Sequence, residues 1–347
     1  MQKPMQNEAR CIVSREWKLI LLLVGLMALT YARAEAKLNV VATTEHDAAI
    51  ARVVGGDRIA VAYLAKGTQD PHSIVPRRSF AVHLNRADLL IVNGQGLETA
   101  WLPTALAEST NARIREGKPG YLDASIGAAL IPYDPADVKA PPLIRGLVAL
   151  QSLVVSKPPD LTAGYNHHYW LDPANGNSTA KAILDKLVLL DPSNATVFKA
   201  NYERFAARLK EKLVVWDAQM KPFEGTEIVS YHRSWTYLAR RHGLKIAGYI
   251  EPSEPLLLSS TNLDNPPDRA EKAVLVARMA QSRAKLVIAE PYQDQALVKE
   301  IAGAAGAAVV ILSSSVSQAD GIDDYFAFFD QLYGWLTQAL NAVKALP

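Results

Sequence analysis

The stretch between residues 195 and 220 reads ATVFKANYERFAARLKEKLVVWDAQM and contains neither glycine nor proline. It is rich in residues that favour helices, and its apolar side chains recur at the three- and four-residue spacing of a helix face. Asp191-Pro192-Ser193-Asn194 supplies start signals before it, and Pro222 ends it. At about 1.5 Å per residue this stretch would extend for about 39 Å, so it is predicted to form one long, stiff helix.

Short β-branched runs alternate with amphipathic helical patterns on both sides of this helix. The predicted strands are 38–44, 59–64, 89–93, 227–231, 245–249, 286–289 and 309–312. Such alternation predicts parallel sheets covered by helices on both faces. We therefore predict an α/β fold with two parallel-sheet lobes, a cleft between them and one long rigid helix bridging them. The alternative is that the long helix is a crossover within one large sheet, but average helices have only about 11–12 residues.

These patterns divide the chain into four predicted segments. Residues 1–36 form a signal peptide, 37–190 an N-terminal α/β lobe, 191–221 the bridging helix and 222–347 a C-terminal α/β lobe.

The first segment has the parts of a secretory signal. Arg15 and Lys18 precede an apolar run at 19–29, and small-residue patterns that end at Ala34 and Ala36 follow it. A membrane span needs about 20 apolar residues, so this run is short for an anchor. Cleavage is predicted after Ala34 or Ala36, which removes the chain's single cysteine, Cys11. We expect an exported, unlipidated product in a periplasm.

Composition narrows the classes of function. The chain has 37 Lys and Arg against 35 Asp and Glu, a net charge of +2, and this near-balance argues against a nucleic-acid partner. One cysteine excludes an intramolecular disulfide framework and every CxxC-type metal site. A metal site in this chain must therefore use histidines and carboxylates.

Three histidines occupy positions where a parallel-sheet protein binds ligands. His72 follows predicted strand 59–64, His232 follows Tyr231 at the end of strand 227–231, and His168 opens an apolar run. Open α/β sheets bind ligands at the carboxyl ends of their strands, and imidazole is a common ligand of Zn²⁺ and also suits Mn²⁺ and Fe sites. From the residues alone, a three-histidine metal site and three separate surface histidines remain equal alternatives.

The other histidines are expected to have no such role. We expect His46, His83 and His242 to be solvated surface residues. His167 and His168 are adjacent, so in an extended segment their side chains would point in opposite directions, and at most one of them would face the cleft.

Several short motifs occur in a fixed order along nearly the whole mature chain. They are GTQDPHS (67–73), ADLLIVNG (87–94), GLE (96–98), HYWLDP (168–173) and SYH (230–232). Each motif alone is weak, but together they resemble the solute-binding proteins of zinc and manganese ABC importers, the cluster A-I or cluster 9 metal-binding class. That family has two α/β lobes with a metal cleft between them, bridged by a long helix, so the resemblance implies a metal cleft here.

The resemblance implies a ligand set and a function. It implies that His72, His168 and His232 bind a divalent metal ion, and the HYWLDP motif selects His168 rather than His167. It also implies a monomer that is not an enzyme, that captures the ion with high affinity and that passes it to the membrane permease of an ABC importer. Three imidazoles favour Zn²⁺ as the transported ion, with Mn²⁺ as the alternative, since manganese prefers oxygen ligands.

The chain departs from the family at the fourth ligand. The family commonly has an aspartate late in the chain, whereas the corresponding stretch 309–315 reads VVILSSS. Water, Glu290, Asp320 or Asp323 could complete the site, because zinc accepts three protein ligands and water. Residues 133–165 contain no histidine, so the His-rich flap of some zinc importers is not expected here.

Three alternatives remain open. The first is a manganese- or iron-binding importer protein of the same family. The second is a secreted zinc-dependent enzyme, which would need Glu290 or Glu251 as a general base but has no HExxH motif to support it. The third is a binder of an organic ligand or a chelated metal, for which Trp170, Trp235 and Tyr231 could supply aromatic surface.

Overall fold

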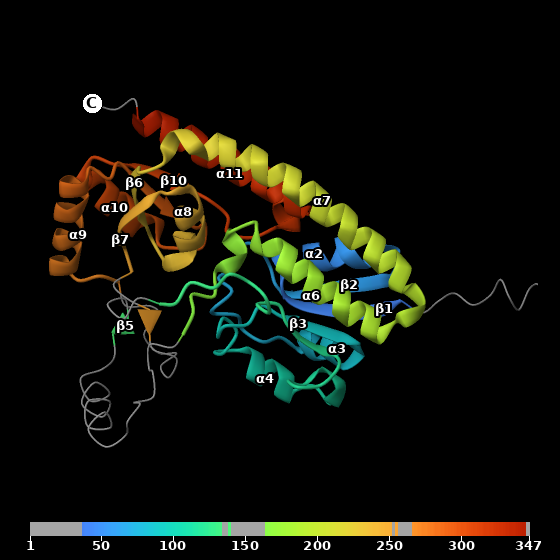
Figure 1. Ribbon diagram of the computed structural model, residues 1–347. Coiled ribbons are helices and arrows are strands. Elements are labelled where there is room, and N and C mark those ends of the chain that lie inside the picture. The colour runs from blue at the N-terminus through green and yellow to red at the C-terminus, as the bar shows by residue number, and fades with distance from the viewer. Residues whose placement is uncertain (1–36, 134–137, 140–163, 252–253, 256–265, 345–347) are drawn as a thin grey trace, which may run out of the picture. The chain divides into compact units, whose positions relative to one another are not determined.

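In the part of the chain that the structure describes, the strands form two four-stranded parallel sheets and one short parallel pair (Figure 1). The first sheet has the order β2-β1-β3-β4, with β1 at Leu38–Thr44, β2 at Ile59–Ala65, β3 at Leu89–Val92 and β4 at Tyr121–Asp123. The second has the order β10-β9-β6-β7, with β6 at Glu227–Ser230, β7 at Lys245–Tyr249, β9 at Leu286–Ala289 and β10 at Ala308–Ile311. The pair joins β5 (Val138–Lys139) to β8 (Glu254–Pro255).

The computed structural model describes residues 37–133, 138–139, 164–251, 254–255 and 266–344. The predicted signal peptide and most of the histidine-free stretch 133–165 lie outside the described residues, as do residues 252–253, 256–265 and 345–347. The helices are α2 (Glu45–Gly55), α3 (Arg78–Arg86), α4 (Leu102–Ala107), α6 (Asn175–Leu190), α7 (Ala195–Met220), α8 (Thr236–His242), α9 (Arg269–Ser282), α10 (Gln295–Ala305) and α11 (Tyr325–Lys344). None of these helices is long and apolar enough to cross a membrane.

Alternate residues of each strand pack on opposite faces of the sheets. In β1, Val40 and Ala42 belong to a large apolar cluster, whereas Val41 belongs to a second cluster with α3 and α4. In β9, Leu286 and Ile288 join the same large cluster, whereas Val287 and Ala289 pack in a third cluster with α9 and α10. This two-residue period is the expected geometry of a strand with both faces covered. The predicted fold class, with two parallel-sheet lobes, is confirmed.

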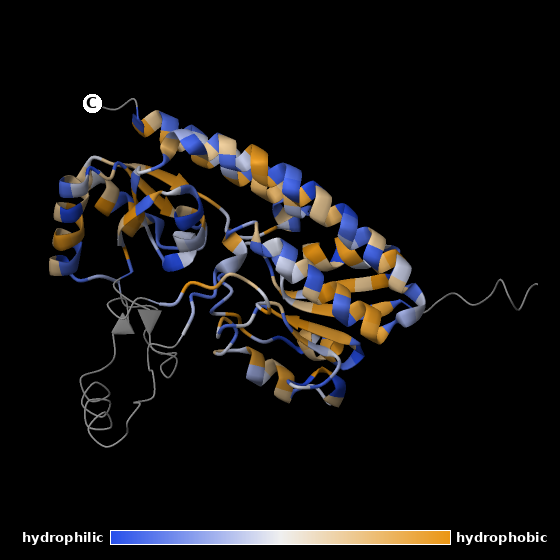
Figure 2. Cartoon of the chain, in the orientation of Figure 1, coloured by the Kyte–Doolittle hydropathy of each residue, from blue (hydrophilic) through white to orange (hydrophobic). Residues whose placement is uncertain are grey.

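Helix α7 has the bounds that the sequence predicted. One face of the helix is buried and packs against α2, α6 and α11. The buried residues on this face include Phe198, Phe205, Leu209, Trp216 and Met220. Figure 1 shows α7 and α11 lying side by side. Figure 2 shows mixed polar and apolar residues along both helices, as expected for helices with one buried and one exposed face. The predicted segment limits, 37–190, 191–221 and 222–347, remain predictions.

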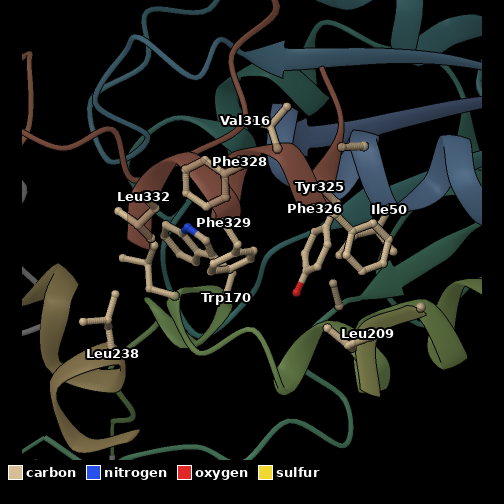
Figure 3. Close-up of a cluster of buried hydrophobic side chains, with 14 of the residues drawn as sticks. Ile50, Trp170, Leu209, Leu238, Val316, Tyr325, Phe326, Phe328, Phe329 and Leu332 are labelled. Carbon is tan, nitrogen blue, oxygen red and sulfur yellow. The ribbon is translucent and has the colours of Figure 1, made fainter. Parts of the chain in front are cut away.

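The large apolar cluster draws residues from both sheets and from α7 and α11. Figure 3 shows its aromatic part, in which the side chains of α11 gather beside residues from other elements. The labelled aromatic residues of α11 are Tyr325, Phe326, Phe328 and Phe329, and they lie with Ile50, Trp170 and Leu209. A continuous core of this kind holds the carboxyl ends of the strands in fixed positions.

Two histidines predicted to be solvated are buried instead. His46 is 2% exposed and lies edge-on to Tyr325, Phe328 and Phe329, with ring centroids 5.2 to 6.0 Å apart. His242 is 8% exposed, and its Nε2 lies 2.8 Å from the Tyr333 hydroxyl. The prediction was wrong because the acidic neighbours of His46 suggested a polar surface, whereas α11 covers that turn of α2. His83 is exposed, as predicted.

Burial of His46 makes stability depend on pH. Burial lowers the pKa of His46 to about 3, whereas an unfolded chain has a value near 6.5. Between pH 6.5 and 3, His46 is therefore protonated in the unfolded chain but not in the folded one. The free energy of unfolding is highest above pH 6.5 and falls by about 1.4 kcal/mol for each pH unit as the pH drops toward 3. In metal-free protein, we expect His46→Leu to flatten this loss between pH 6 and 4.5 in urea unfolding. His83→Leu is the matched control, and equal slopes in wild type and His46→Leu would contradict the prediction.

Candidate metal centre

Four histidines converge at the carboxyl ends of strands from both sheets. Each of them offers a ligand atom, and these atoms lie within 4.8 Å of one another; the residues are His72, His167, His168 and His232. Ring centroids of neighbouring pairs are 4.4 to 5.2 Å apart. The structure thus brings together all three histidines that the sequence singled out, and adds His167.

The loop after β2 carries His72, and contacts at its base hold it. The Glu45 carboxylate, at the start of α2, accepts hydrogen bonds of 2.8 Å from the backbone N–H groups of Gly67 and Gln318. A Cβ on Gly67 would lie 1.9 Å from the carbonyl oxygen of Val316, so only glycine fits this close approach. The loop that presents His72 is therefore fixed against two other parts of the chain.

Asp70 orients the His72 ring. Its Oδ1 lies 2.6 Å from His72 Nδ1 and also accepts the His72 backbone N–H at 3.0 Å. Burial opposes ionisation of Asp70, but electrostatic attraction to His72 and the hydrogen bonds that His72 donates outweigh it and lower the pKa of Asp70 to about 2. Since an ionised carboxylate can only accept, the Nδ1 of His72 carries the proton and its Nε2 carries the lone pair.

His168 is oriented in the same way by an amide. Asn166 Oδ1 accepts from His168 Nδ1 at 2.8 Å and from its backbone N–H at 2.9 Å. The Asn166 Nδ2 donates to the carbonyl of Arg233 at 2.9 Å, which fixes the amide. The Nε2 of His168 is buried and has no hydrogen-bond partner among the described residues. Leaving such an atom without a partner is costly, and a bound metal ion would satisfy it.

His232 is held at the ends of two neighbouring parallel strands. It follows β6, and its Nδ1 is hydrogen-bonded to Glu251, which follows β7. The backbone N–H of Glu251 donates to the Tyr231 carbonyl at 2.9 Å, so the ladder continues to this point. The carboxylate places the proton of His232 on Nδ1 and the lone pair on Nε2. Such acceptors on the outer nitrogen are the usual support of histidines that bind metals.

His167 contradicts the expectation that only one of the adjacent histidines would face the cleft. Its Nε2 lies 2.8 Å from His72 Nε2, and its Nδ1 lies 3.2 Å from the Tyr133 hydroxyl. Alternation of side chains holds only in extended backbone, whereas His168 has φ −81° and ψ 28°. Both rings can therefore point to the same side. No motif in the sequence marked His167, and only its position next to His168 could have suggested it.

Burial keeps the central histidines neutral. Desolvation is the largest cause, and the neighbouring imidazoles add to it, so that the pKa values of His167 and His168 lie well below the usual value. Metals bind the neutral form of imidazole. These two histidines are thus in the protonation state that a cation needs.

The carboxylates considered as a fourth ligand lie outside the group of four. Asp320 and Asp323 are exposed. Glu290, at the end of β9, is fully buried, and burial raises its pKa to about 7. Among the described residues, no aspartate or glutamate has an oxygen within the 4.8 Å group.

A polar cavity of about 330 Å³ adjoins the cluster. His72 and His232 form part of its lining, together with three acidic side chains and two tyrosines: Asp70, Glu251, Asp294, Tyr231 and Tyr292. Carboxylates that line a cavity raise the local concentration of cations. This cavity therefore has the charge expected beside a cation site.

The large aromatic residues near the histidines belong to the core. Trp170 is 5% exposed and donates from Nε1 to the Ser314 carbonyl at 2.7 Å, and Trp235 is fully buried. Neither ring presents a face to the cavity. Among the residues that the structure describes, the aromatic surface of this cavity thus consists of Tyr231 and Tyr292.

Comparison with known proteins agrees with this architecture. A family model described as "Zinc-uptake complex component A periplasmic" matches residues 40–339. The chain is 24% identical over 230 residues to the "High-affinity zinc uptake system protein ZnuA" of Bacillus subtilis, a match that covers 65% of this chain and 66% of that protein. It is 25% identical over 338 residues to the "Manganese ABC transporter substrate-binding lipoprotein PsaA" of Streptococcus pneumoniae, covering 93% of this chain and 96% of the relative.

A solved structure described as "Crystal structure of ZnuA" superposes with a TM-score of 0.67 at 20% identity, covering 87% of this chain and 99% of that one. At this identity the likeness concerns the fold. The family match covers most of the chain, from the first strand into the last helix. The chain belongs to the family of periplasmic zinc-uptake complex component A proteins, the metal-binding components of ABC importers.

Proposed function

We propose that this protein captures Zn²⁺ through His72, His168 and His232 and delivers it to the membrane permease of an ABC importer. The observation that carries the proposal is the shared arrangement of the three rings. Each ring comes from a different segment, and each has its Nδ1 held by an acceptor, namely Asp70, Asn166 or Glu251. Three imidazole nitrogens aimed at one point bind a divalent cation.

The ligand chemistry favours zinc over manganese. The group contains imidazoles and no carboxylate among the described residues, and Mn²⁺ prefers oxygen ligands. The names of the relatives include both zinc and manganese, so family membership alone leaves the cargo open. The periplasmic location, export by residues 1–36 and a monomeric state are part of this proposal. An enzyme is a weaker reading, because the family is a transport component.

Elemental analysis of the mature protein, purified without chelator, tests the proposal. We expect about one zinc per chain, lost in the His72→Ala/His168→Ala double variant because two of the three nitrogens are gone. His83→Ala, which removes an exposed imidazole, should keep its metal. Manganese in place of zinc would retain the importer and change the cargo. No metal, even after zinc is added back, would rule out the site and favour a binder of organic ligands.

A further inference from the structure

We propose, building on the metal capture inferred above, that His167 is a fourth ligand, so that the transported ion is held by four imidazole nitrogens and Zn²⁺ is selected over Mn²⁺. The fourth coordination position then belongs to neither water nor a carboxylate. The observation behind this is the placement of the His167 Nε2 in direct contact with a predicted ligand, His72.

The distances suit a shared ion. The Nε2 atoms of His167 and His72 are 2.8 Å apart. Two ligand nitrogens of a tetrahedral zinc, each at about 2.0–2.1 Å from the ion, are separated by about 3.3–3.4 Å. A rotation of either ring that separates the two nitrogens by about half an ångström is enough. The His167 ring centroid also lies 4.4 Å from that of His168, so the ring borders two other ligands at once.

The hydrogen bonds of His167 allow its ring proton to sit on either nitrogen, as a change from the metal-free to the metal-bound form requires. Nδ1 of His72 already donates to a carboxylate, so in metal-free protein His167 Nε2 is the donor of the pair. A metal requires the lone pair on that Nε2, and the proton must then sit on Nδ1. The Tyr133 hydroxyl contacts Nδ1 and can either donate or accept. The same contact therefore supports both the metal-free and the metal-bound form.

The backbone of His167 is also fixed. Its carbonyl accepts from Asn93 Nδ2 at 3.1 Å, and the residue is 6% exposed. Asn93 directly follows β3, at the carboxyl edge of the first sheet. Because hydrogen bonds hold both the backbone carbonyl of His167 and its ring Nδ1, the ring has little freedom to leave the cluster, as a ligand requires.

A fourth imidazole ligand would favour Zn²⁺ over Mn²⁺. With His167 bound, Asp70 and Glu251 act through the histidines rather than directly on the ion. Four neutral nitrogens suit Zn²⁺ and give Mn²⁺ none of the oxygen ligands that it prefers. A closed four-coordinate site also keeps no open position for a reacting water, unlike the sites of zinc enzymes.

X-ray absorption at the zinc edge counts the imidazoles directly. In the mature protein loaded with one zinc, we expect four imidazoles in wild type and three plus an oxygen in His167→Ala. His83→Ala, the matched control on the exposed face of α3, should keep four. In competition with a zinc chelator, His167→Ala should weaken zinc binding by about 10²–10³-fold while changing manganese binding less, which lowers the selectivity.

The number of imidazoles bound to zinc in the wild-type protein tests the role of His167 without any variant. Three imidazoles and an oxygen in wild type would overturn the role of His167 and leave capture by His72, His168 and His232 intact. Failure of wild type to bind zinc at all would instead overturn the capture itself. Equal zinc-to-manganese selectivity in wild type and a folded His167→Ala would also contradict the proposal.

Discussion

His168→Ala should lower zinc affinity by about 10²–10³-fold. Structural zinc sites are worth about 10–16 kcal/mol in total, which gives about 2.5–4 kcal/mol per ligand for four ligands. Each 1.4 kcal/mol is about tenfold in affinity. His168 is 1% exposed and its Nε2 has no other partner among the described residues, so nothing nearby replaces it. Competition against a chelator of known zinc affinity measures the change.

Two controls separate loss of a ligand from loss of structure. His83→Ala removes an exposed histidine and should bind zinc as wild type does. His168→Asn places an amide N–H where the Nδ1 of His168 lies and so keeps the contact with Asn166; it should fold as wild type does and still lose affinity. Wild-type affinity in a folded His168→Ala would place the zinc site elsewhere in the chain.

Gly67→Ala should both destabilise the protein and weaken metal binding. The added Cβ would lie 1.9 Å from the Val316 carbonyl oxygen and 3.0 Å from Ser317 Cβ. Backbone atoms cannot move aside as a flexible side chain does, so we expect a cost of about 3 kcal/mol in urea unfolding. The displaced loop carries His72, and zinc affinity should fall by about 10–100-fold.

Gly303→Ala is the matched control. Gly303 lies within α10, and a Cβ there would meet nothing within 4 Å. Alanine favours a helix interior over glycine by about 1 kcal/mol, so this variant should gain stability and leave zinc binding unchanged. If Gly67→Ala kept both wild-type stability and wild-type affinity, the close contact at the base of the His72 loop would have no role.

The sequence predicted the fold because its signals are local. The uninterrupted helical pattern of residues 195–220 and the β-branched strands are properties of neighbouring residues, and the structure places α7 and most strands within one or two residues of the prediction. The three histidines also came from local context, since each adjoins a predicted strand or a motif. Parallel topology alone then implies that the ends of such strands share an edge.

The remaining features depend on contacts between distant parts of the chain. The position of His167 depends on Asn93 and Tyr133 and on a turn at His168 that no local pattern revealed. His46 appeared exposed because its neighbours are acidic, and its burial requires α11, almost 280 residues later. Asp320 and Asp323 lie outside the histidine cluster for the same kind of reason. Their positions depend on tertiary packing, which the spacing of apolar residues in the sequence does not reveal.

The separation of the histidines along the chain gives the cargo a mechanical effect. His72 and His167 lie 95 residues apart, and His232 comes from a third segment in the other sheet. The chain's single cysteine, Cys11, falls in the predicted signal, so no disulfide ties these segments together. A bound ion would be a cross-link that closes long loops, as a disulfide does. Each release of the ion to the permease would therefore remove a reversible cross-link. The metal-free protein that leaves the permease would be less conformationally constrained than the metal-bound protein that docked there.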